Sequence, residues 1–394
     1  MKGIVNKIGN ATKVYAETFE DEAYRQVENM ANYEPYLSSK IRIMPDAHAG
    51  KGCVVGTTMT LNGAVTPNLV GVDIGCGMLA AYLAVNDIDL NKLDNVIREN
   101  VPSGFSVHNI PLYNFDLSRL YCYNAIKSKD FYMRQSLGTL GGGNHFIEVD
   151  KSSHGDLMIV IHSGSRNLGV QVCNYYQKLA VENLSKRSDC SELIQRLKSE
   201  GREREIQSEL AKLKQNSVDK ELAHLEGVYF ENYIHDMDIV QQYASMNRHF
   251  ILDSICRNMG IFTWDYIETI HNYIDVKNMI LRKGAVSAQN GESLIIPMNM
   301  RDGSLICVGK GNEDWNYSAP HGAGRIMSRA KAKERISMQD FKESMAHVYT
   351  TSVCEGTIDE APQAYKSSEE IMSLIGDTVE IVDVVKPIYN FKAN

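Results

Sequence analysis

The sequence predicts an α+β fold, in which mixed β-sheets form the body and a helical insertion lies near residues 171–260. Short apolar runs bounded by glycine, proline or polar residues predict buried strands. A long stretch with acidic and basic residues at helical spacing predicts the insertion. Six short stretches carry metal-ligand or charged side chains, and in four of them glycines lie beside a histidine, which indicates a site assembled at the ends of the strands.

The predicted strands are short, rich in β-branched residues and bounded by glycine, proline or polar residues. Apolar runs of this length are typical of buried strands. They cover residues 157–162, 293–298, 304–309 and 379–385.

The helical insertion is most distinct in SELIQRLKSEGREREIQSELAKLKQ. We expect an antiparallel hairpin of helices here; a coiled-coil surface for a partner is the less favoured alternative, because the heptad run is short. No repeat or linker divides the chain, so residues 1–394 are expected to form a single catalytic domain. An interrupted apolar stripe in the insertion is formed by Leu193, Leu197, Ile206, Leu210 and Leu213.

Composition and charge narrow the class of protein. The chain is 43% hydrophobic and has a net charge of −8, which argues against disorder and against non-specific coating of nucleic acid, although a local basic groove stays open. The N-terminal MKGIVNKIGN has no apolar signal core, and no run of eighteen apolar residues occurs. We therefore expect a cytoplasmic protein with no membrane partner, whose eight cysteines are mostly buried thiols.

Six stretches combine metal-ligand or charged side chains with small residues, and five of the eleven histidines lie in or beside them. Each stretch alone has a structural explanation, since a histidine at a strand end is more often a hydrogen-bonded core residue and a lone cysteine a buried thiol. Their recurrence favours a common site. The stretches are residues 44–52, 71–78, 138–149, 161–169, 271–274 and 319–325.

Five of these side chains offer oxygen, sulfur and nitrogen donors: Asp73, Cys76, His145, His162 and His271. Such a mixture suits Mn²⁺, Fe²⁺, Co²⁺ or Zn²⁺ better than Ca²⁺ or Mg²⁺. A thiolate can bridge two ions, and two-metal sites commonly act on phosphates.

Two glycine-rich segments, GTLGGGN and HGAGR, can expose backbone N–H groups to an anion. The second is expected to open a helix, whose N-terminus favours negative charge. Neither segment matches a Walker loop or a dinucleotide fingerprint.

The motifs MPDxHxGKG, GVDIGCGM, GGGNHFIE, IHSGSR, RKGA, HGAGR and EAPxAYK, in this order, resemble the RtcB family of GTP-dependent RNA ligases from about residue 40 onward. The resemblance implies mixed sheets around a central metal site. It also implies an enzyme of RNA repair or tRNA splicing, which joins 2′,3′-cyclic phosphate or 3′-phosphate ends to 5′-hydroxyl ends with two Mn²⁺ ions and GTP.

The resemblance also assigns roles to individual residues. His321 matches the nucleophile that carries GMP, and the five donor residues match the metal ligands, with Cys76 bridging. The remaining matches concern the nucleotide and phosphates. Asn144, Glu148, Ala323 and Gly324 would contact the guanylate, Tyr365 and Lys392 the base, and Arg166 and Asn272 the phosphates of the RNA or nucleotide.

The segment IIPMNMRDGS departs from the common family pattern. Asn299 stands where a nucleotide-contacting serine is usual, Ser304 stays in register, and Arg301 and Asp302 add charge near the expected guanine. We expect Asn299 and Ser304 to belong to the nucleotide site.

The expected partners are GTP and the single-stranded ends of RNA, because a site that joins ends has to hold termini. The resemblance is compatible with an accessory activating protein and with any oligomeric state. The main alternative is a two-metal phosphoesterase or cyclic phosphodiesterase, in which His321 acts as a general acid and no nucleotide is used. An RNA-binding adaptor with a degenerate site is a weaker alternative, since every ligand type is present.

Overall fold

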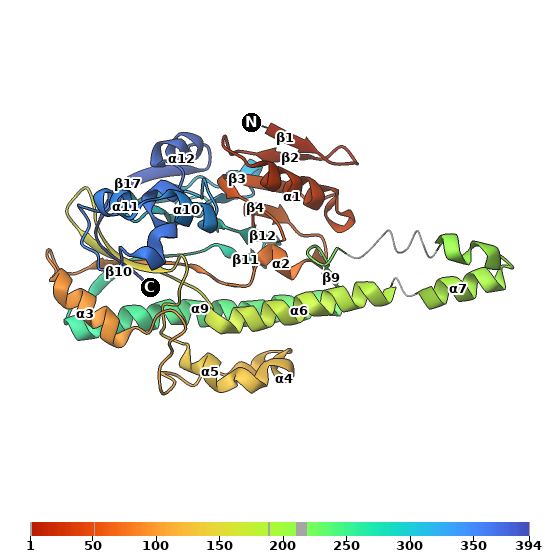
Figure 1. Cartoon of the computed structure of the whole chain (residues 1–394), viewed down its shortest axis with the longest axis horizontal. Helices are drawn as coiled ribbons and strands as arrows, with labels where there is room; N and C mark the ends of the chain where they lie inside the picture. Colours follow the sequence, from red (N-terminus) through yellow and green to blue (C-terminus); the bar gives the residue numbers. More distant parts are fainter. Residues whose placement is uncertain (1, 51, 188–189, 210–218, 394) are drawn as a thin grey trace.

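The computed structural model describes residues 2–50, 52–187, 190–209 and 219–393. Strands fill the upper part of the view in Figure 1, and two long antiparallel helices, α6 and α9, run beneath them. The predicted α+β class is confirmed.

The first large sheet has six strands in the order β1-β2-β3-β4-β12-β11. All neighbouring pairs are antiparallel except β2 and β3, which are parallel. The strands are β1 (Lys2–Val5), β2 (Ala11–Val14), β3 (Ile41–His48), β4 (Val55–Thr60), β11 (Asn272–Asp275) and β12 (Ile280–Lys283).

The second large sheet has seven strands in the order β10-β6-β8-β7-β17-β15-β14. The edge strands β10 and β14 also contact each other, so this sheet curls toward closure. All four predicted strands belong to it. The inner strand β8 is buried along its whole length, as predicted, whereas the predicted run at 379–385 of β17 is partly exposed, because Glu380 and Val382 face solvent. The strands are β6 (Gly77–Leu83), β7 (Phe146–Lys151), β8 (Leu157–Ser163), β10 (Thr263–Ile270), β14 (Ser293–Asn299), β15 (Gly303–Gly309) and β17 (Val379–Lys392).

Two short strand pairs and a set of helices complete the described part of the chain. The pairs are β13 (Ala285–Ser287) with β16 (Ser318–Pro320) and β5 (Ala64–Val65) with β9 (Leu225–Glu226). The α-helices are α1 (Asp21–Asn32), α2 (Pro67–Val70), α3 (Leu90–Asn100), α4 (Tyr123–Ile126), α5 (Asp130–Gln135), α6 (Arg166–Arg187), α7 (Cys190–Ser199), α9 (Val228–Met259), α10 (Arg329–Arg335), α11 (Met338–Ser344) and α12 (Ser368–Leu374). The 3₁₀ turns are η1 (Glu34–Tyr36), η2 (Leu117–Arg119), η3 (Lys127–Lys129), η4 (Glu203–Glu205), η5 (Glu313–Trp315), η6 (Glu355–Glu360) and η7 (Pro362–Ala364).

The helical insertion is confirmed, with one difference in its extent. α6 and α9 pack against each other as an antiparallel pair, and α7 projects beyond the body (Figure 1). α9 is a core helix, because Tyr233, Met237 and Ile251 are fully buried on it. The charge-laced excursion is therefore narrower than predicted. Within the predicted apolar stripe Leu197 is buried and Ile206 is half-buried, whereas the Leu193 side chain, Leu210 and Leu213 lie outside the described part.

Candidate metal and nucleotide site

A cavity of about 580 Å³ opens between the two large sheets. Its volume falls in the range of small-molecule sites. Thirteen of the residues predicted from the sequence line it: Asp73, Cys76, Asn144, Glu148, His162, His271, Asn272, Asn299, His321, Ala323, Gly324, Tyr365 and Lys392.

The pairing of strands in the second sheet gathers three of the donor residues. Cys76 directly precedes β6, His145 directly precedes β7, and His162 lies at the end of β8. In the antiparallel register His162 is the partner of both Met78 and Phe146. His145 and His162, which follow Cys76 by 69 and 86 positions, therefore meet it where the three strands end.

His271 joins this cluster from the junction of the two sheets. It stands between β10 and β11, and its backbone N–H donates a 2.9 Å hydrogen bond to the Cys76 carbonyl. Its ring centroid lies 5.2 Å from that of His162. The two sheets thus contribute jointly to one group of donors.

Cys76 is the member that the donor sets share. Its Sγ lies 3.3 Å from Nε2 of His162 and 3.5 Å from Nε2 of His145, and that nitrogen lies 3.0 Å from Oδ2 of Asp73. Two groups of three residues have ligand atoms within 4.8 Å of one another. One is Cys76, His162 and His271, and the other is Asp73, Cys76 and His145. A shared thiolate between two such groups fits the predicted bridging role.

The histidine rings are oriented for ligation by their second nitrogens. Nδ1 of His145 lies 2.8 Å from the Leu140 carbonyl, and Nδ1 of His162 lies 3.2 Å from the Asn144 carbonyl. A backbone acceptor at Nδ1 leaves Nε2 as the free lone pair. The buried Nδ1 of His271 has no hydrogen-bond partner among the described residues, which is costly unless a ligand occupies it.

Burial sets the protonation of the cluster. It lowers the pKa of His162 and of His271 well below the ordinary value, so both imidazoles are neutral and able to bind a metal. Burial opposes ionisation of Asp73 as well, but when His145 is protonated at Nε2 its hydrogen bond and charge outweigh burial and lower the pKa of that carboxyl. Burial and the neighbouring Asp73 raise the pKa of the Cys76 thiol. A bound cation reverses that effect, because a coordinating thiol is deprotonated.

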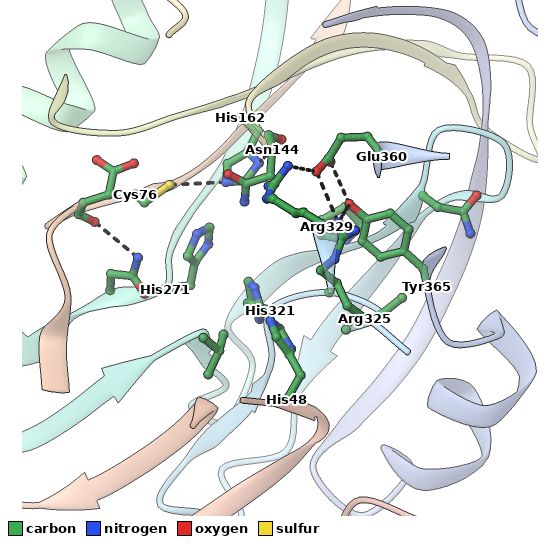
Figure 2. Close-up of a pocket in the computed structure, with 18 of the residues that line it drawn as sticks. His48, Cys76, Asn144, His162, His271, His321, Arg325, Arg329, Glu360 and Tyr365 are labelled. Carbon is green, nitrogen blue, oxygen red and sulfur yellow. Dashed lines mark hydrogen bonds and ion pairs between the residues drawn. The ribbon is translucent and has the colours of Figure 1, made fainter. Parts of the chain in front are cut away.

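His321 lies beside His271 of the donor cluster (Figure 2), and a buried carboxylate holds its ring. Its Nδ1 donates to Oδ2 of Asp46 over 2.6 Å, and Asp46 is fully buried. Nε2 then carries the lone pair, as a nucleophilic imidazole requires. The ring centroid lies 4.9 Å from that of His271, so an attacked phosphate at His321 would also be close to a metal bound by the cluster.

The loop after His321 packs tightly on the segment that carries Asp46. Gly324 has φ +74°, and a Cβ atom there would overlap the backbone carbonyl of Asp46. Lys366 fixes the other side of that segment, since its Nζ donates to the carbonyl of Pro45 over 2.7 Å. A glycine at 324 is therefore required both by its backbone angle and by this close approach.

The prediction that HGAGR opens a helix is wrong. α10 begins at Arg329 with Ser328 as its N-cap, eight residues after His321. The positive φ of Gly324 and its contact with Asp46 keep the intervening residues in an irregular loop. Any anion held beside His321 would meet loop backbone there and not a helix terminus.

One wall of the cavity is organised around Glu360, which is 2% exposed (Figure 2). Its Oε2 accepts from the Tyr365 hydroxyl at 2.7 Å and from Lys392 Nζ at 2.9 Å. Its Oε1 lies 2.6 Å from Arg329 and 3.2 Å from Arg325. Burial opposes the charge of Glu360, but Lys392 and Arg329 outweigh it and lower the pKa to about 2. Both predicted base-contacting residues, Tyr365 and Lys392, are thus fixed by one carboxylate.

Glu148 reaches the cavity from β7. Its Oε2 accepts a 2.6 Å hydrogen bond from Asn390, and burial together with the adjacent Asp150 raises its pKa well above the ordinary value. Asn144 lies at the exposed lip in front of it, with its backbone carbonyl turned to His162. The two residues thus line one side of the space between the donor cluster and Glu360.

Asn272 and Asn299 line the cavity but also hold local backbone. Asn272 accepts from the Gly284 N–H at 3.1 Å. Asn299 caps the turn between β14 and β15, where its Oδ1 accepts 3.0 Å hydrogen bonds from the backbone N–H groups of Arg301 and Asp302. Arg301 and Asp302 pair with each other at 2.8 Å, so much of the added charge of this segment is neutralised locally.

Three predicted site residues do not line the cavity. His145 lies directly behind it, in contact with Cys76 and Asp73. Ser304 is buried in β15. Arg166 turns away, because its guanidinium donates to Thr139 Oγ1 and to the Gly104 carbonyl, each at 3.1 Å.

Sequence reasoning assigned no role to Asp46 or Glu360, although both shape the site. Asp46 lies within the motif MPDxHxGKG and Glu360 is the first residue of EAPxAYK, so each belonged to a recognised motif. The available signal was an acidic residue beside a small-residue loop. His48, from the same motif as Asp46, also lines the cavity, and burial lowers the pKa of its imidazole to about 4.

In the described part of the chain, no helix combines the length and apolarity needed to cross a membrane.

Comparison with known proteins identifies the family. The family model for tRNA-splicing ligase RtcB matches residues 26–125 and 123–393. The RNA-splicing ligase RtcB of Escherichia coli K12 is 32% identical, over 94% of this chain and 93% of its own. The tRNA-splicing ligases RtcB of Archaeoglobus fulgidus and Aeropyrum pernix are 28% and 26% identical, each over 91% of this chain and 88% and 89% of their own.

The site combines a candidate metal cluster with a histidine that is held by a buried carboxylate, in a fold of mixed helices and sheets. Together with the match over nearly the whole length, this shows that the chain belongs to the RtcB family.

Proposed function

We propose that this protein is an RNA ligase that joins a 2′,3′-cyclic phosphate or 3′-phosphate end to a 5′-hydroxyl end, through a covalent histidine–GMP intermediate on His321. The observation that carries the proposal is the His321–Asp46 pair, 4.9 Å from the ring of His271. The proposed setting is the cytoplasm, in RNA repair or tRNA splicing.

In the proposed first step Nε2 of His321 attacks the α-phosphorus of GTP, a phosphoramidate bond forms, and pyrophosphate leaves. Nδ1–H of His321 donates a hydrogen bond to Asp46 throughout, and this carboxylate stabilises the ring as the ring gains positive charge. In the second step the RNA 3′-phosphate takes the guanylate from His321, which restores the imidazole. The 5′-hydroxyl then attacks that activated phosphate, and GMP leaves as the RNA strands are joined.

The donor cluster fits two Mn²⁺ ions, because two groups of mixed donors share Cys76 and because the buried Nδ1 of His271 has no partner among the described residues. Asp73, Cys76, His145, His162 and His271 would hold them. When bound, such ions neutralise phosphate charge and supply a nucleophile for opening a cyclic phosphate.

The nucleotide would lie between Glu148 and the Glu360 wall. Glu148, with its raised pKa, and Asn144 face one side of the cavity, and Tyr365 and Lys392 the other. Ala323 and Gly324 lie beside His321, near the place of the α-phosphate. Asn299 and Asn272 line the same space, whereas Ser304 and Arg166 would reach a ligand only if their surroundings moved. We also propose that residues 1–394 act as one catalytic domain, since the donors lie in the second sheet and at its junction with the first.

The test is the joining of a labelled 3′-phosphate RNA to a 5′-hydroxyl RNA, followed on a denaturing gel with GTP or ATP and with or without Mn²⁺. Ligation that requires GTP and Mn²⁺ and is lost in His321→Ala is expected. Opening of a 2′,3′-cyclic phosphate without any joining, and without need of GTP, would favour the phosphodiesterase alternative and overturn the proposal.

A further inference from the structure

An aromatic surface adjoins the mouth of the cavity, in a part of the chain to which the mechanism assigns no role. Within residues 105–132 lie seven of the nineteen large hydrophobic side chains that are exposed in the described part of the chain. Phe105 is 96% exposed and Tyr132 is 37% exposed. The Tyr132 hydroxyl lies 3.4 Å from the Phe105 carbonyl, so these two aromatic residues are neighbours.

Backbone contacts connect this surface directly to the cavity. The Gly104 N–H donates a 2.9 Å hydrogen bond to the Gly141 carbonyl, and the Gly104 carbonyl accepts from Arg166. Gly141 opens the segment that ends at Asn144, whose side chain lines the cavity. On its other side this segment approaches Arg329 of the cavity wall, because a Cβ atom at Gly143 would stand 3.9 Å from the Arg329 guanidinium. Phe105 therefore directly follows a residue that is hydrogen-bonded to Gly141, three positions before the lip residue Asn144.

The aromatic residues stand on a firmly held base. Tyr243 of α9 donates a 2.6 Å hydrogen bond to the Met133 carbonyl, beside Tyr132. Asn247 of the same helix accepts from the N–H of Gly138 at 2.7 Å. A surface whose backbone is fixed while its rings stay in solvent loses little conformational entropy when it binds a planar ligand.

The charge of the segment suits a polyanion. Residues 101–135 carry four basic and two acidic side chains, in a chain whose net charge is −8. One of the two acids, Asp130, is paired with Arg134 at 2.8 Å, and the other, Asp116, caps its own turn at Ser118. Lys127 and Lys129 lie exposed just before α5, which carries Tyr132. Exposed rings beside basic residues are typical of surfaces that bind single-stranded nucleic acid.

We propose that Phe105 and Tyr132 form a stacking surface for the unpaired bases of an RNA end whose terminus lies in the cavity. The inference rests on the proposed function for the identity of the ligand, and it deepens that function by placing the strand outside the cavity. Stacking accepts any base, so this surface would hold RNA ends of varied sequence. The sequence offered no such indication, because these aromatic residues are 27 positions apart.

The experiment measures the affinity of the full-length protein for short fluorescent single-stranded RNAs by anisotropy, without GTP. One RNA ends in a 3′-phosphate and the other in a 5′-hydroxyl. Phe105→Ala should raise the dissociation constant for at least one of them about tenfold, in keeping with the loss of one stacked base. Phe105→Trp should restore the affinity. Because Phe105 is exposed, its replacement is not expected to lower the melting temperature.

The matched control is Phe262→Ala, which removes another exposed ring. Phe262 precedes β10, whose register pairs Thr263 with Leu83 at the far end and Ile270 with Gly77 at the metal end. The eight residues of β10 place it about 26 Å from the donor cluster. Its replacement should change the dissociation constant by less than about twofold.

Replacement of single bases by abasic residues locates the stacked position. At that position the wild-type protein should lose about tenfold in affinity, whereas Phe105→Ala should lose almost nothing further. Unchanged RNA affinity in Phe105→Ala, or an equal loss in Phe262→Ala, would overturn the proposal. Self-association that Phe105→Ala abolishes, with RNA affinity unchanged, would assign the surface to a protein partner instead. Labelling of the wild-type protein by GTP is measured separately, so failure of the proposed function is distinguishable from failure of this inference.

Discussion

Replacing Asp46 by asparagine should slow the guanylylation of His321 far more than it weakens the binding of GTP. Asp46 is fully buried, its Oδ2 accepts from His321 Nδ1 at 2.6 Å, and its Oδ1 has no hydrogen-bond partner among the described residues. An asparagine has two orientations at this position, and both are unfavourable. If its oxygen faces Nδ1, the amide N–H₂ is buried without an acceptor where Oδ1 stood. If its N–H₂ faces Nδ1, the imidazole proton moves to Nε2, the nitrogen that has to attack.

The loss of a charge-assisted hydrogen bond of this kind is about 2 kcal/mol, which corresponds to roughly thirtyfold in rate. The assay is the initial rate of protein labelling by α-³²P-labelled GTP with Mn²⁺, measured over a range of GTP concentrations. The maximal rate should fall and the half-saturating GTP concentration should stay within about threefold, because Asp46 orients the nucleophile and does not line the cavity.

Asp156→Asn, at an exposed aspartate between β7 and β8, is the control and should label at the wild-type rate. A maximal rate of Asp46→Asn within threefold of the wild type, in a variant that melts normally, would refute the reasoning. It would mean that the carboxylate does not set the proton position on His321.

Three further predictions concern Gly324, Cys76 and Glu268. Gly324→Ala should lower the free energy of unfolding by at least about 2 kcal/mol in urea titrations, because an alanine at φ +74° is strained and its Cβ overlaps Asp46. The control Gly376→Ala should change the free energy of unfolding little, because no atom lies within 4 Å of the added Cβ. Equal effects of the two replacements would contradict the packing at Gly324. Cys76→Ala should reduce the manganese retained after dialysis from two ions per chain to fewer than one, because both donor groups share that sulfur. The control Cys53→Ala, at another buried cysteine, should keep both ions. Retention of two ions in Cys76→Ala would argue against a bridging thiolate. Burial opposes ionisation of Glu268, but the hydrogen bond from His249 and the charge of Arg248 outweigh burial and lower the pKa of Glu268 from the ordinary 4.5 to about 2. The contribution of Glu268 to stability is therefore complete above about pH 5 and is lost as the pH falls toward 2. Glu268→Gln should therefore be less stable than the wild type at pH 7 and show a flatter dependence of the urea midpoint on pH between 5 and 2; parallel curves would contradict it.

The strands were predictable because their signal is local. The run at 157–162 is apolar at consecutive positions, and β8 is covered on both faces in the centre of the second sheet. The long helix α9 was predicted only as part of a charged excursion, because its buried face includes the polar residues Asp236, Asn247 and Arg248, which weaken the apolar stripe. Its place in the core depends on α6 and β8, which the local sequence does not specify.

The donor residues were predictable from their chemistry. A thiol, an imidazole and a carboxylate beside glycine-rich turns indicate metal binding, whatever their separation along the chain. The pairing of Asp46 with His321 was not predictable, since 275 residues separate them and only the packed loops bring them together. The same limit applies to Arg166. Its type suits phosphate binding, but the direction of its side chain is decided by Gly104 and Thr139.

The most direct test of the account is mass spectrometry of the protein after incubation with GTP and Mn²⁺, with the covalent adduct mapped to a peptide. We expect one guanylate per chain, on the peptide that contains His321, labile to acid and stable to alkali as a phosphoramidate is. A guanylate on a different residue, or an unmodified protein that nevertheless joins RNA, would contradict the central claim.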